Sequence, residues 1–342
     1  MNSEGLAAEE SPVERSQVLA HLYDPIAGDI QELRSYLEAE FKSSEPYVHE
    51  LLEHLSRFRG KQIRPACVFL AGRCFGEIKE DHIRCAAVVE LIHTATLVHD
   101  DLLDQADVRR RVETIHTRYG DRASILLGDI IYARGFVIST QVEGAARLLA
   151  ECTREICIGE IMQVGNAGNL NLTLGEYEEI IHRKTAILYG LSCRLGAMLS
   201  GADPDQADAM ERYGNRMGEA FQIIDDSLDL IGDAEVVGKS LGTDLANGKL
   251  TLPVLLLRES LDEQGRQRLL KLLEICHSSD EANHERSEIA AMLAEHGIME
   301  MVRERARSVV TDALEALRSA AKPGPARQRL EDLAEYILQR EL

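Results

Sequence analysis

Basic residues are scarce in this chain: 38 lysines and arginines stand against 58 aspartates and glutamates, for a net charge of −20. A nucleic-acid backbone requires a basic footprint, so this balance argues against nucleic acid as a partner. No two of the seven cysteines form a CxxC pair, and their scattered positions argue against a disulfide framework. Buried thiols in a reducing compartment are the better interpretation.

Long apolar runs are also absent. No stretch of about 18 uncharged apolar residues occurs, so no transmembrane segment is expected. The first residues, MNSEGLAAEESPVERS, lack the basic start and apolar run of a signal peptide. We therefore expect a cytoplasmic protein, with residues 1–16 as a disordered tail and residues 17–342 as one folded domain.

Proline is missing between Pro65 and Pro204, which leaves room for long helices. Apolar residues recur at three- and four-residue spacing, so the sequence predicts a single-domain, all-α helical bundle. Segment 83–104 is apolar on most faces and is expected at its centre. Thr173 and Glu176 match a capping box at one helix start. Helices are predicted at 15–42, 46–58, 83–104, 121–140, 143–162, 174–200, 205–231, 252–257, 262–277, 285–317 and 326–340, with breaks at 163–172, 201–204, 232–248 and 278–284.

Two copies of an acidic DDxxD pattern lie in these apolar helices, at residues 100–104 and 225–229. The first and last aspartates of each copy are four residues apart, so they share a helix face, about 6 Å apart along the axis. Mg²⁺ prefers a few carboxylates, with water and phosphate oxygens completing its octahedron. Two such faces across a cavity would hold Mg²⁺ ions against a diphosphate. Solvated or salt-bridged acids could explain one copy, but hardly two inside apolar helices with basic residues nearby.

Basic residues accompany both motifs. Lys61 and Arg64 share a face if 61–64 is helical, and Arg109, Arg110 and Arg111 follow the first motif directly. These arginines could simply neutralise the aspartates, yet arginine is also the side chain best shaped for bidentate phosphate contact. His93 lies two turns before the first motif on the same face. A lone histidine in an apolar helix is more often a core residue, but this alignment favours a phosphate donor.

A third cluster surrounds the second motif. Gln222 precedes it by one turn, and Lys239 and Lys249 lie in the glycine-containing segment 238–253, which overlaps a mobile flap expected at 232–248. The order of residues is not that of a Walker A loop. Lys184 and Thr185 add a further candidate phosphate contact inside an apolar helix.

Together these motifs resemble the trans-isoprenyl diphosphate synthases, also called trans-prenyltransferases, of medium- and long-chain type. The resemblance runs from Gly60 to the C-terminal region and leaves only the first 45 or so residues uninformative. Its motifs are GKQIRP, ELIHTATLVHDDLLDQADVRRR, LLGD, GEIMQ, HRKTA, FQIIDDSLDLIGD and GKSLGTDLANGKLTLP. The resemblance implies an isoprenoid-synthase bundle around a central cavity, with 17–342 as the catalytic domain. It also implies Mg²⁺-dependent 1'-4 condensation of isopentenyl diphosphate with an allylic diphosphate, releasing diphosphate.

The resemblance also assigns roles to residues. It implies a homodimer and three Mg²⁺ ions with substrate bound, which Mn²⁺ can replace. The main metal ligands would be Asp100, Asp104 and Asp225, supported by Asp101, Asp226 and Asp229. Isopentenyl diphosphate would be bound by Lys61, Arg64, His93 and Arg110. The allylic diphosphate would be bound by Arg109, Lys184, Thr185, Gln222, Lys239 and Lys249. Catalysis would depend on Asp100, Asp104, Arg109, Lys184, Asp225 and Lys239.

This chain departs from the family pattern at two positions. Gln62 stands where the family usually has arginine, which removes a positive charge near the isopentenyl site. Arg111 stands where the family usually has glycine, which is expected to alter the loop path or the allylic affinity. Neither change deletes a metal ligand, so we expect an active enzyme.

Product length should follow cavity depth. In the family, bulky aromatic residues four and five positions before the first aspartate stop chain growth early. Here these positions are Thr96 and Ala95, both small. We therefore expect an all-trans polyprenyl product longer than farnesyl.

Three other classes of protein fit these motifs less well. A class I terpene cyclase or squalene-synthase-like enzyme usually pairs DDxxD with a different second motif and guides cations with aromatic walls. Here the second motif is again DDxxD, aromatics are 4 % and tryptophan is absent. A regulatory subunit of a two-part synthase tends to lose acidic motifs, and a divalent-ion buffer would not need Lys61, Arg64 and Arg109.

Overall fold

The structure, a computed structural model, describes residues 21–58, 60–231, 242–278 and 282–339. The predicted tail at 1–16, Lys239 and most of the predicted flap lie outside the described residues. The helices in chain order are η1 (Asp24–Ile26), α2 (Ala27–Glu40), α3 (Pro46–Leu55), α4 (Ile63–Arg73), α5 (Glu80–Leu103), α6 (Ile115–Tyr119), α7 (Asp121–Ser139), α8 (Ala145–Gly165), α9 (Leu174–Ile181), the π-helix η2 (His182–Ala186), α10 (Ile187–Leu199), α11 (Pro204–Ile231), α13 (Thr243–Ala246), α14 (Leu252–Ser260), α15 (Glu263–Ser278), α16 (Asn283–Glu295), α17 (Ile298–Ala320) and α18 (Pro325–Leu338). One short antiparallel hairpin, β1 (Val108–Arg109) and β2 (Val112–Glu113), follows α5.

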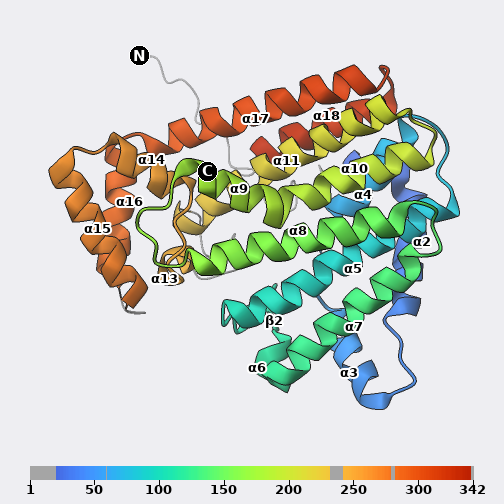
Figure 1. The fold of residues 1–342 in the computed structure, drawn as a ribbon, viewed down its shortest axis with the longest axis horizontal. Helices are drawn as coiled ribbons and strands as arrows, with labels where there is room; N and C mark the ends of the chain where they lie inside the picture. Colours follow the sequence, from blue (N-terminus) through green and yellow to red (C-terminus); the bar gives the residue numbers. More distant parts are fainter. Residues whose placement is uncertain (1–20, 59, 232–241, 279–281, 340–342) are drawn as a thin grey trace, which may run out of the picture.

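The bundle is built around α5, as the apolar segment 83–104 predicts. Most of its side chains between Ile83 and Val98 are buried, because α4, α7 and α10 pack around it. On the other side, α11 packs against α10 and α17, so that the long helices form layers around one continuous core (Figure 1). The all-α helical bundle is therefore confirmed.

The capping box at Thr173 is also confirmed. The backbone N–H of Thr173 donates to Glu176 Oε2 at 2.8 Å, and the Glu176 N–H donates to Thr173 Oγ1 at 3.2 Å. These bonds satisfy two N–H groups that a helix start would otherwise leave free. They fix the beginning of α9, which continues through η2 into α10 across the predicted 174–200 helix.

Other predicted boundaries are wrong. The segment 285–317 is two helices, because Gly297 adopts φ +62° and ends the helical path between α16 and α17. Helix α4 was not predicted as a full helix, and Lys61 lies before it rather than on its face, since Gln62 has φ +54°. The break predicted at 232–248 contains the short helix α13.

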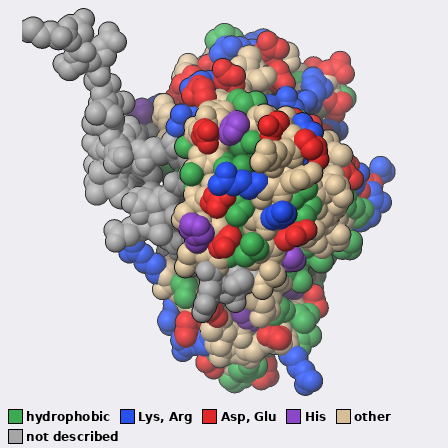
Figure 2. Space-filling view, turned by 90° about the vertical axis from the view of Figure 1, so that its left-hand side faces the viewer, with side chains coloured by type: hydrophobic (Ala, Val, Ile, Leu, Met, Phe, Trp, Pro, Cys, Tyr) green, Lys and Arg blue, Asp and Glu red, His purple; other side chains and the backbone are tan. Residues whose placement is uncertain are grey.

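The surface gives no sign of a single charged patch on the end of the molecule that carries α15 and α16. Acidic, basic and histidine side chains are interspersed over this face (Figure 2). In the part of the chain that the structure describes, no helix is both long and apolar enough to cross a membrane.

Candidate active site

The first acidic motif lies at the C-terminal end of α5, and each of its aspartates faces a different cation. Lys249 Nζ contacts both carboxylate oxygens of Asp104, at 2.7 and 2.9 Å. Arg109 donates through Nε and Nη2 to Asp101 Oδ1, at 2.7 and 2.6 Å. Lys184 Nζ lies 3.8 Å from Asp100 Oδ2. The motif is therefore held together by three separate basic side chains.

Lys184 comes from the π-helix η2, which lies between α9 and α10. Its Nζ donates to Gln163 Oε1 at 2.6 Å and forms an ion pair with Glu160, both on α8. Helix α8 can approach this closely because residue 159 is glycine: a Cβ there would lie 2.6 Å from the backbone N of Lys184. A π-helix is a rare element that is frequent at functional sites. Here it presents Lys184 to α5 and α8 together.

Burial dominates the electrostatics of this cluster. It raises the pKa of Asp100 to about 6; Lys184 opposes this rise, while Glu160 and Asp104 add to it. Burial alone would lower the pKa of Lys184, but the negative charges of Asp100 and Glu160 outweigh it, so that the pKa is raised. Lys184 is therefore a firmly charged ammonium next to a carboxylate that protonates unusually easily.

The second motif lies near the end of α11 and is tied to α9 and η2. The Tyr177 hydroxyl donates to Asp226 Oδ2 at 2.7 Å, and Gln222 Nε2 donates to Asp226 Oδ1 at 2.6 Å. Thr185 Oγ1 donates to Gln222 Oε1 at 2.8 Å. Burial, together with Asp244, raises the pKa of Asp226 to about 8, against the two hydrogen bonds that favour its ionised form. Asp225, its neighbour, is half-buried.

Residues 242–249 connect the two motifs. At one end, Asp229 accepts hydrogen bonds from Thr243 Oγ1 at 2.6 Å and from the Asp244 N–H at 3.0 Å. At the other end, the Lys249 N–H donates to the Asp244 carbonyl at 2.8 Å, and the Lys249 side chain reaches Asp104. The acidic motifs of α5 and α11 therefore belong to one site.

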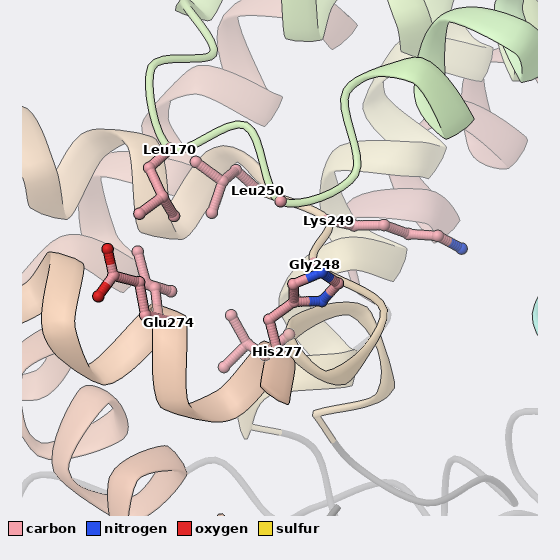
Figure 3. A pocket seen from close by; sticks show the side chains of 9 residues that line it. Leu170, Gly248, Lys249, Leu250, Glu274 and His277 are labelled. Atoms are coloured by element: carbon pink, nitrogen blue, oxygen red, sulfur yellow. The ribbon is translucent and has the colours of Figure 1, made fainter. Parts of the chain in front are cut away.

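A small pocket lies behind Lys249. It is lined by Leu170, Leu250, Glu274 and His277 among others, while the Lys249 side chain points away from it (Figure 3). The Gly168 N–H donates to the Gly248 carbonyl at 2.8 Å. This bond holds the backbone beside Lys249 against the 166–172 loop. The residues around the pocket therefore help to fix the position of Lys249.

The predicted basic pocket lies beside the first motif. The Arg64 guanidinium lies 4.2 Å from the centre of the Tyr189 ring, and within the described residues Arg64 Nε is buried without a hydrogen-bond partner. Burial, followed by the charges of Arg64 and Arg110, lowers the pKa of His93 well below its usual value. Lys61 Nζ donates to the Tyr336 hydroxyl at 3.0 Å. The pocket thus contains the cations Lys61 and Arg64 and the neutral imidazole of His93.

The two departures from the family pattern have visible structural consequences. Arg110 and Arg111 form the turn between β1 and β2 with φ +52° and +65°, a region that favours glycine. This turn places the Arg110 guanidinium against the Phe58 carbonyl and beside Gly60. The Gln62 side chain accepts a hydrogen bond from Arg34 Nε at 3.0 Å, so a cation from α2 lies where the family's arginine is missing.

The structure thus brings most of the predicted site residues together. Ala95 is fully buried in α5, five residues before Asp100, and Thr96 Oγ1 donates to the His93 carbonyl at 2.7 Å. In the described ranges no three acidic, histidine or cysteine side chains converge on one point. The carboxylates nevertheless fit Mg²⁺, which takes hard oxygen ligands and keeps several positions for water and phosphate. Asp101 Oδ2, buried without a partner among the described residues, is one such oxygen.

Several contributing residues were not predicted as site residues, among them Glu90, Glu160, Gln163 and Tyr177. Glu160 and Gln163 lie in the GEIMQ segment, and their three-residue spacing in a helix was the available signal. Glu90 precedes His93 by three residues; burial raises its pKa, and Arg64 and Arg110 oppose that rise. Nothing in the sequence marks Tyr177, whose partner is 49 residues away.

The all-α bundle joins two DDxxD motifs to basic side chains, as the resemblance to the trans-isoprenyl diphosphate synthases implies. The comparisons with known proteins agree, because the family model described as polyprenyl synthetase matches residues 45–292. An octaprenyl diphosphate synthase of Haemophilus influenzae is 32 % identical, covering 86 % of this chain and 88 % of that protein. A short chain isoprenyl diphosphate synthase of Methanothermobacter thermautotrophicus is 35 % identical, covering 84 % and 89 %.

A solved structure is also similar over nearly its whole length. The polyprenyl synthase of Caulobacter crescentus, complexed with calcium and isoprenyl diphosphate, has a TM-score of 0.88 and 31 % identity, covering 95 % of this chain and 98 % of that one. The chain therefore belongs to the polyprenyl synthetase family, and the predicted class, a prenyltransferase that makes polyprenyl diphosphates, is confirmed.

Proposed function

We propose that the protein condenses isopentenyl diphosphate with an allylic diphosphate, in 1'-4 fashion, to an all-trans polyprenyl diphosphate longer than farnesyl. The observation that carries this proposal is the convergence of both acidic motifs, through Lys184 and residues 242–249, beside a separate basic pocket. Two sites for anions, one at the aspartates and one in the basic pocket, fit two diphosphate substrates that must meet.

Asp100, Asp104 and Asp225 would hold Mg²⁺, three ions with substrate bound, and Mn²⁺ can take its place. Asp101, Asp226 and Asp229 would support these ligands, and their carboxylates are held by Arg109, Tyr177 and Thr243 respectively. Magnesium bound here supplies positive charge for the leaving diphosphate. Arg109, Lys184, Lys239 and Lys249 add further charge, while Thr185 and Gln222 set the position of η2.

Isopentenyl diphosphate would bind to Lys61, Arg64, His93 and Arg110. Among the described residues the Arg64 Nε–H group has no hydrogen-bond partner, so it can donate to a phosphate oxygen. The neutral His93 can donate one N–H without adding repulsion between cations. The allylic C–O bond then breaks, the double bond of isopentenyl diphosphate attacks the allylic carbon, and the released diphosphate takes the proton. Exclusion of water by the surrounding apolar helices protects the cation from hydrolysis.

The experiment that tests this function is incubation of the purified protein with Mg²⁺, farnesyl diphosphate and labelled isopentenyl diphosphate, with the products sized by chromatography. We expect label in a ladder that ends at one prenyl diphosphate longer than farnesyl. No incorporation with farnesyl, geranyl or dimethylallyl diphosphate would contradict the proposal and favour a regulatory subunit, with Gln62 and Arg111 as the first positions to restore.

The protein is further proposed to act as a cytoplasmic homodimer. Its seven cysteines are free, in keeping with a reducing compartment. Leu126 and Val137 on α7 and Ile161 and Val164 on α8 are exposed by 62, 63, 70 and 55 %, and we call these four the α7–α8 apolar face. Helices α7 and α8 contact each other, and in Figure 1 they come together near the turn that joins them. Exposed apolar side chains gathered on neighbouring helices are typical of a surface that another chain covers.

A further inference from the structure

Tyr177 is a buried polar residue whose hydroxyl is committed to the second acidic motif. The side chain is 3 % exposed, and its hydroxyl donates to Asp226 Oδ2 at 2.7 Å. Asp226 is 6 % exposed and accepts on its other oxygen from Gln222 at 2.6 Å. Both oxygens of this carboxylate therefore depend on protein donors, one from α9 and one from α11.

The same chain of hydrogen bonds continues to the π-helix. Gln222 Oε1 accepts from Thr185 Oγ1 at 2.8 Å, and Thr185 is 8 % exposed. Its neighbour Lys184 spans from η2 to Gln163 and Glu160 on α8 and to Asp100 on α5. Three successive bonds thus run from the Tyr177 hydroxyl through Asp226 and Gln222 to the turn that presents Lys184.

We propose that Tyr177 is a positioning residue: through Asp226 and Gln222 it fixes the π-helix turn that carries Lys184 against the face of α11 that carries Asp225 and Asp229. This inference rests on the proposed function, since its effect is on the site for the metal and the allylic diphosphate. Outer-shell partners of this kind orient the groups that contact a metal, and their loss typically costs about 10- to 100-fold in metal affinity or activity.

Loss of the hydroxyl would have a defined consequence. Without Tyr177, Asp226 Oδ2 would be a buried carboxylate oxygen with no donor, which is unfavourable unless α11 or η2 moves. Either movement changes the separation between Asp225 and Lys184. The basic pocket is expected to be spared, because Arg64 lies over Tyr189, Lys61 donates to Tyr336 and His93 lies on α5, outside this chain of bonds.

Tyr213 provides a matched control. It also is fully buried, on α11, and its hydroxyl donates at 2.7 Å, but to the Leu330 carbonyl of α18. Tyr177→Phe and Tyr213→Phe therefore each remove one buried hydroxyl and a hydrogen bond of 2.7 Å, and the second also removes a 3.4 Å contact with Met217 Sδ. Only the first bond leads to the acidic motif.

The test compares both variants with the wild type in three measurements: KM for each substrate, the Mg²⁺ concentration for half-maximal rate, and calorimetric binding of inorganic diphosphate with Mg²⁺. For Tyr177→Phe we expect about tenfold or larger increases in allylic KM, half-maximal Mg²⁺ and diphosphate Kd, with KM for isopentenyl diphosphate within about twofold of wild type. For Tyr213→Phe we expect a lower Tm and none of these changes.

Equal behaviour of the two variants in all three measurements would overturn the proposal, because Tyr177 would then act only on stability. Should Tyr177→Phe fail to fold, Thr185→Val removes the donor at the other end of the chain and is expected to change the same three values. If wild type shows no turnover, the proposed function fails, whereas calorimetry with inorganic diphosphate and Mg²⁺ still decides the role of Tyr177.

Discussion

The three aspartates of the first motif are each matched to one cation. Lys184, Arg109 and Lys249 lie beside Asp100, Asp101 and Asp104 respectively. Three clustered carboxylates would otherwise repel one another in a site with little water. The same cations suit a diphosphate, so an exchange of partners is expected: Lys184, Arg109 and Lys249 would bind phosphate oxygens, and Asp100 and Asp104 would hold the metal.

This exchange makes activity sensitive to pH through Asp100. Burial raises the pKa of this carboxyl to about 6, so it gains a proton on acidification well before an ordinary aspartate would. Because only the ionised carboxylate binds metal, activity is expected to fall as pH falls through about 6. Protons and Mg²⁺ compete for the carboxylate, so more Mg²⁺ should shift this midpoint to lower pH. Initial rates from pH 5 to 8 at several Mg²⁺ concentrations measure it.

Tm recorded in the same buffers serves as the control, since a protein that unfolds at low pH would imitate the effect. A midpoint that stays constant over a tenfold range of Mg²⁺, in protein that remains folded, would contradict the assignment of Asp100 as a metal ligand.

Ala95 bears on product length. It is fully buried in α5, five residues and about 7.5 Å along the axis from Asp100. If the growing tail runs toward the N-terminal turns of α5, Ala95→Phe should shorten the product, and the smaller Ala95→Leu should give an intermediate length. Chromatographic sizing of products measures both. An unchanged product length in folded variants would mean that residues of other helices limit the cavity. Tm of each variant is measured as well, because overpacking the core costs about 1–3 kcal/mol in stability.

Residues that act through repeated local spacing could be predicted from the sequence, and residues that act through tertiary contact could not. The i, i+4 aspartates and the arginines after them stand out because a helix places them on one face. Tyr177 has no such mark, since a tyrosine on the apolar side of a short helix is usually a core residue. Only the packing of α9 on α11 gives it Asp226 as a partner.

At the scale of elements, the contact between α8 and η2 determines where Lys184 lies. A Cβ at position 159 would lie 2.6 Å from the Lys184 backbone N, so Gly159→Ala must push the two elements apart. We expect a loss of about 1–3 kcal/mol in the free energy of unfolding and a lower kcat/KM. Denaturant unfolding and steady-state rates measure the two effects.

Gly165→Ala is the matched control, because it is the same substitution near the end of the same helix. A Cβ at Gly165 would meet no atom within 4 Å, so its rates should equal those of the wild type and its stability should change by less than about 1 kcal/mol. Similar losses in both variants would mean that α8 needs glycine for a reason other than its approach to Lys184.

Helix boundaries show the same division between local and tertiary information. The capping box of Thr173 and Glu176 is complete in sequence, so the start of α9 was predicted correctly. By contrast, the apolar period continues across Gly297, and one helix was predicted where α16 and α17 meet. The break depends on a left-handed glycine, which a periodic pattern tolerates and does not reveal.

For the whole molecule, the α7–α8 apolar face is the clearest surface without a partner in a single described chain. Leu126 and Val137 lie on α7, Ile161 and Val164 lie on α8, and the two helices contact each other. A chain with net charge −20 would have its copies repel at long range. Association therefore depends on burying apolar area where few charges interfere.

Ile161→Lys tests this association directly. The side chain is 70 % exposed, so the substitution should leave the fold of a single chain intact while placing a charge in the middle of the proposed interface. We expect light scattering after gel filtration to give twice the chain mass for the wild type and the mass of one chain for the variant. Met301→Lys, which changes an apolar residue exposed by 43 % on α17, is the matched control and should keep the double mass. A monomeric wild type, or a variant that stays dimeric, would show that the α7–α8 apolar face does not join two copies.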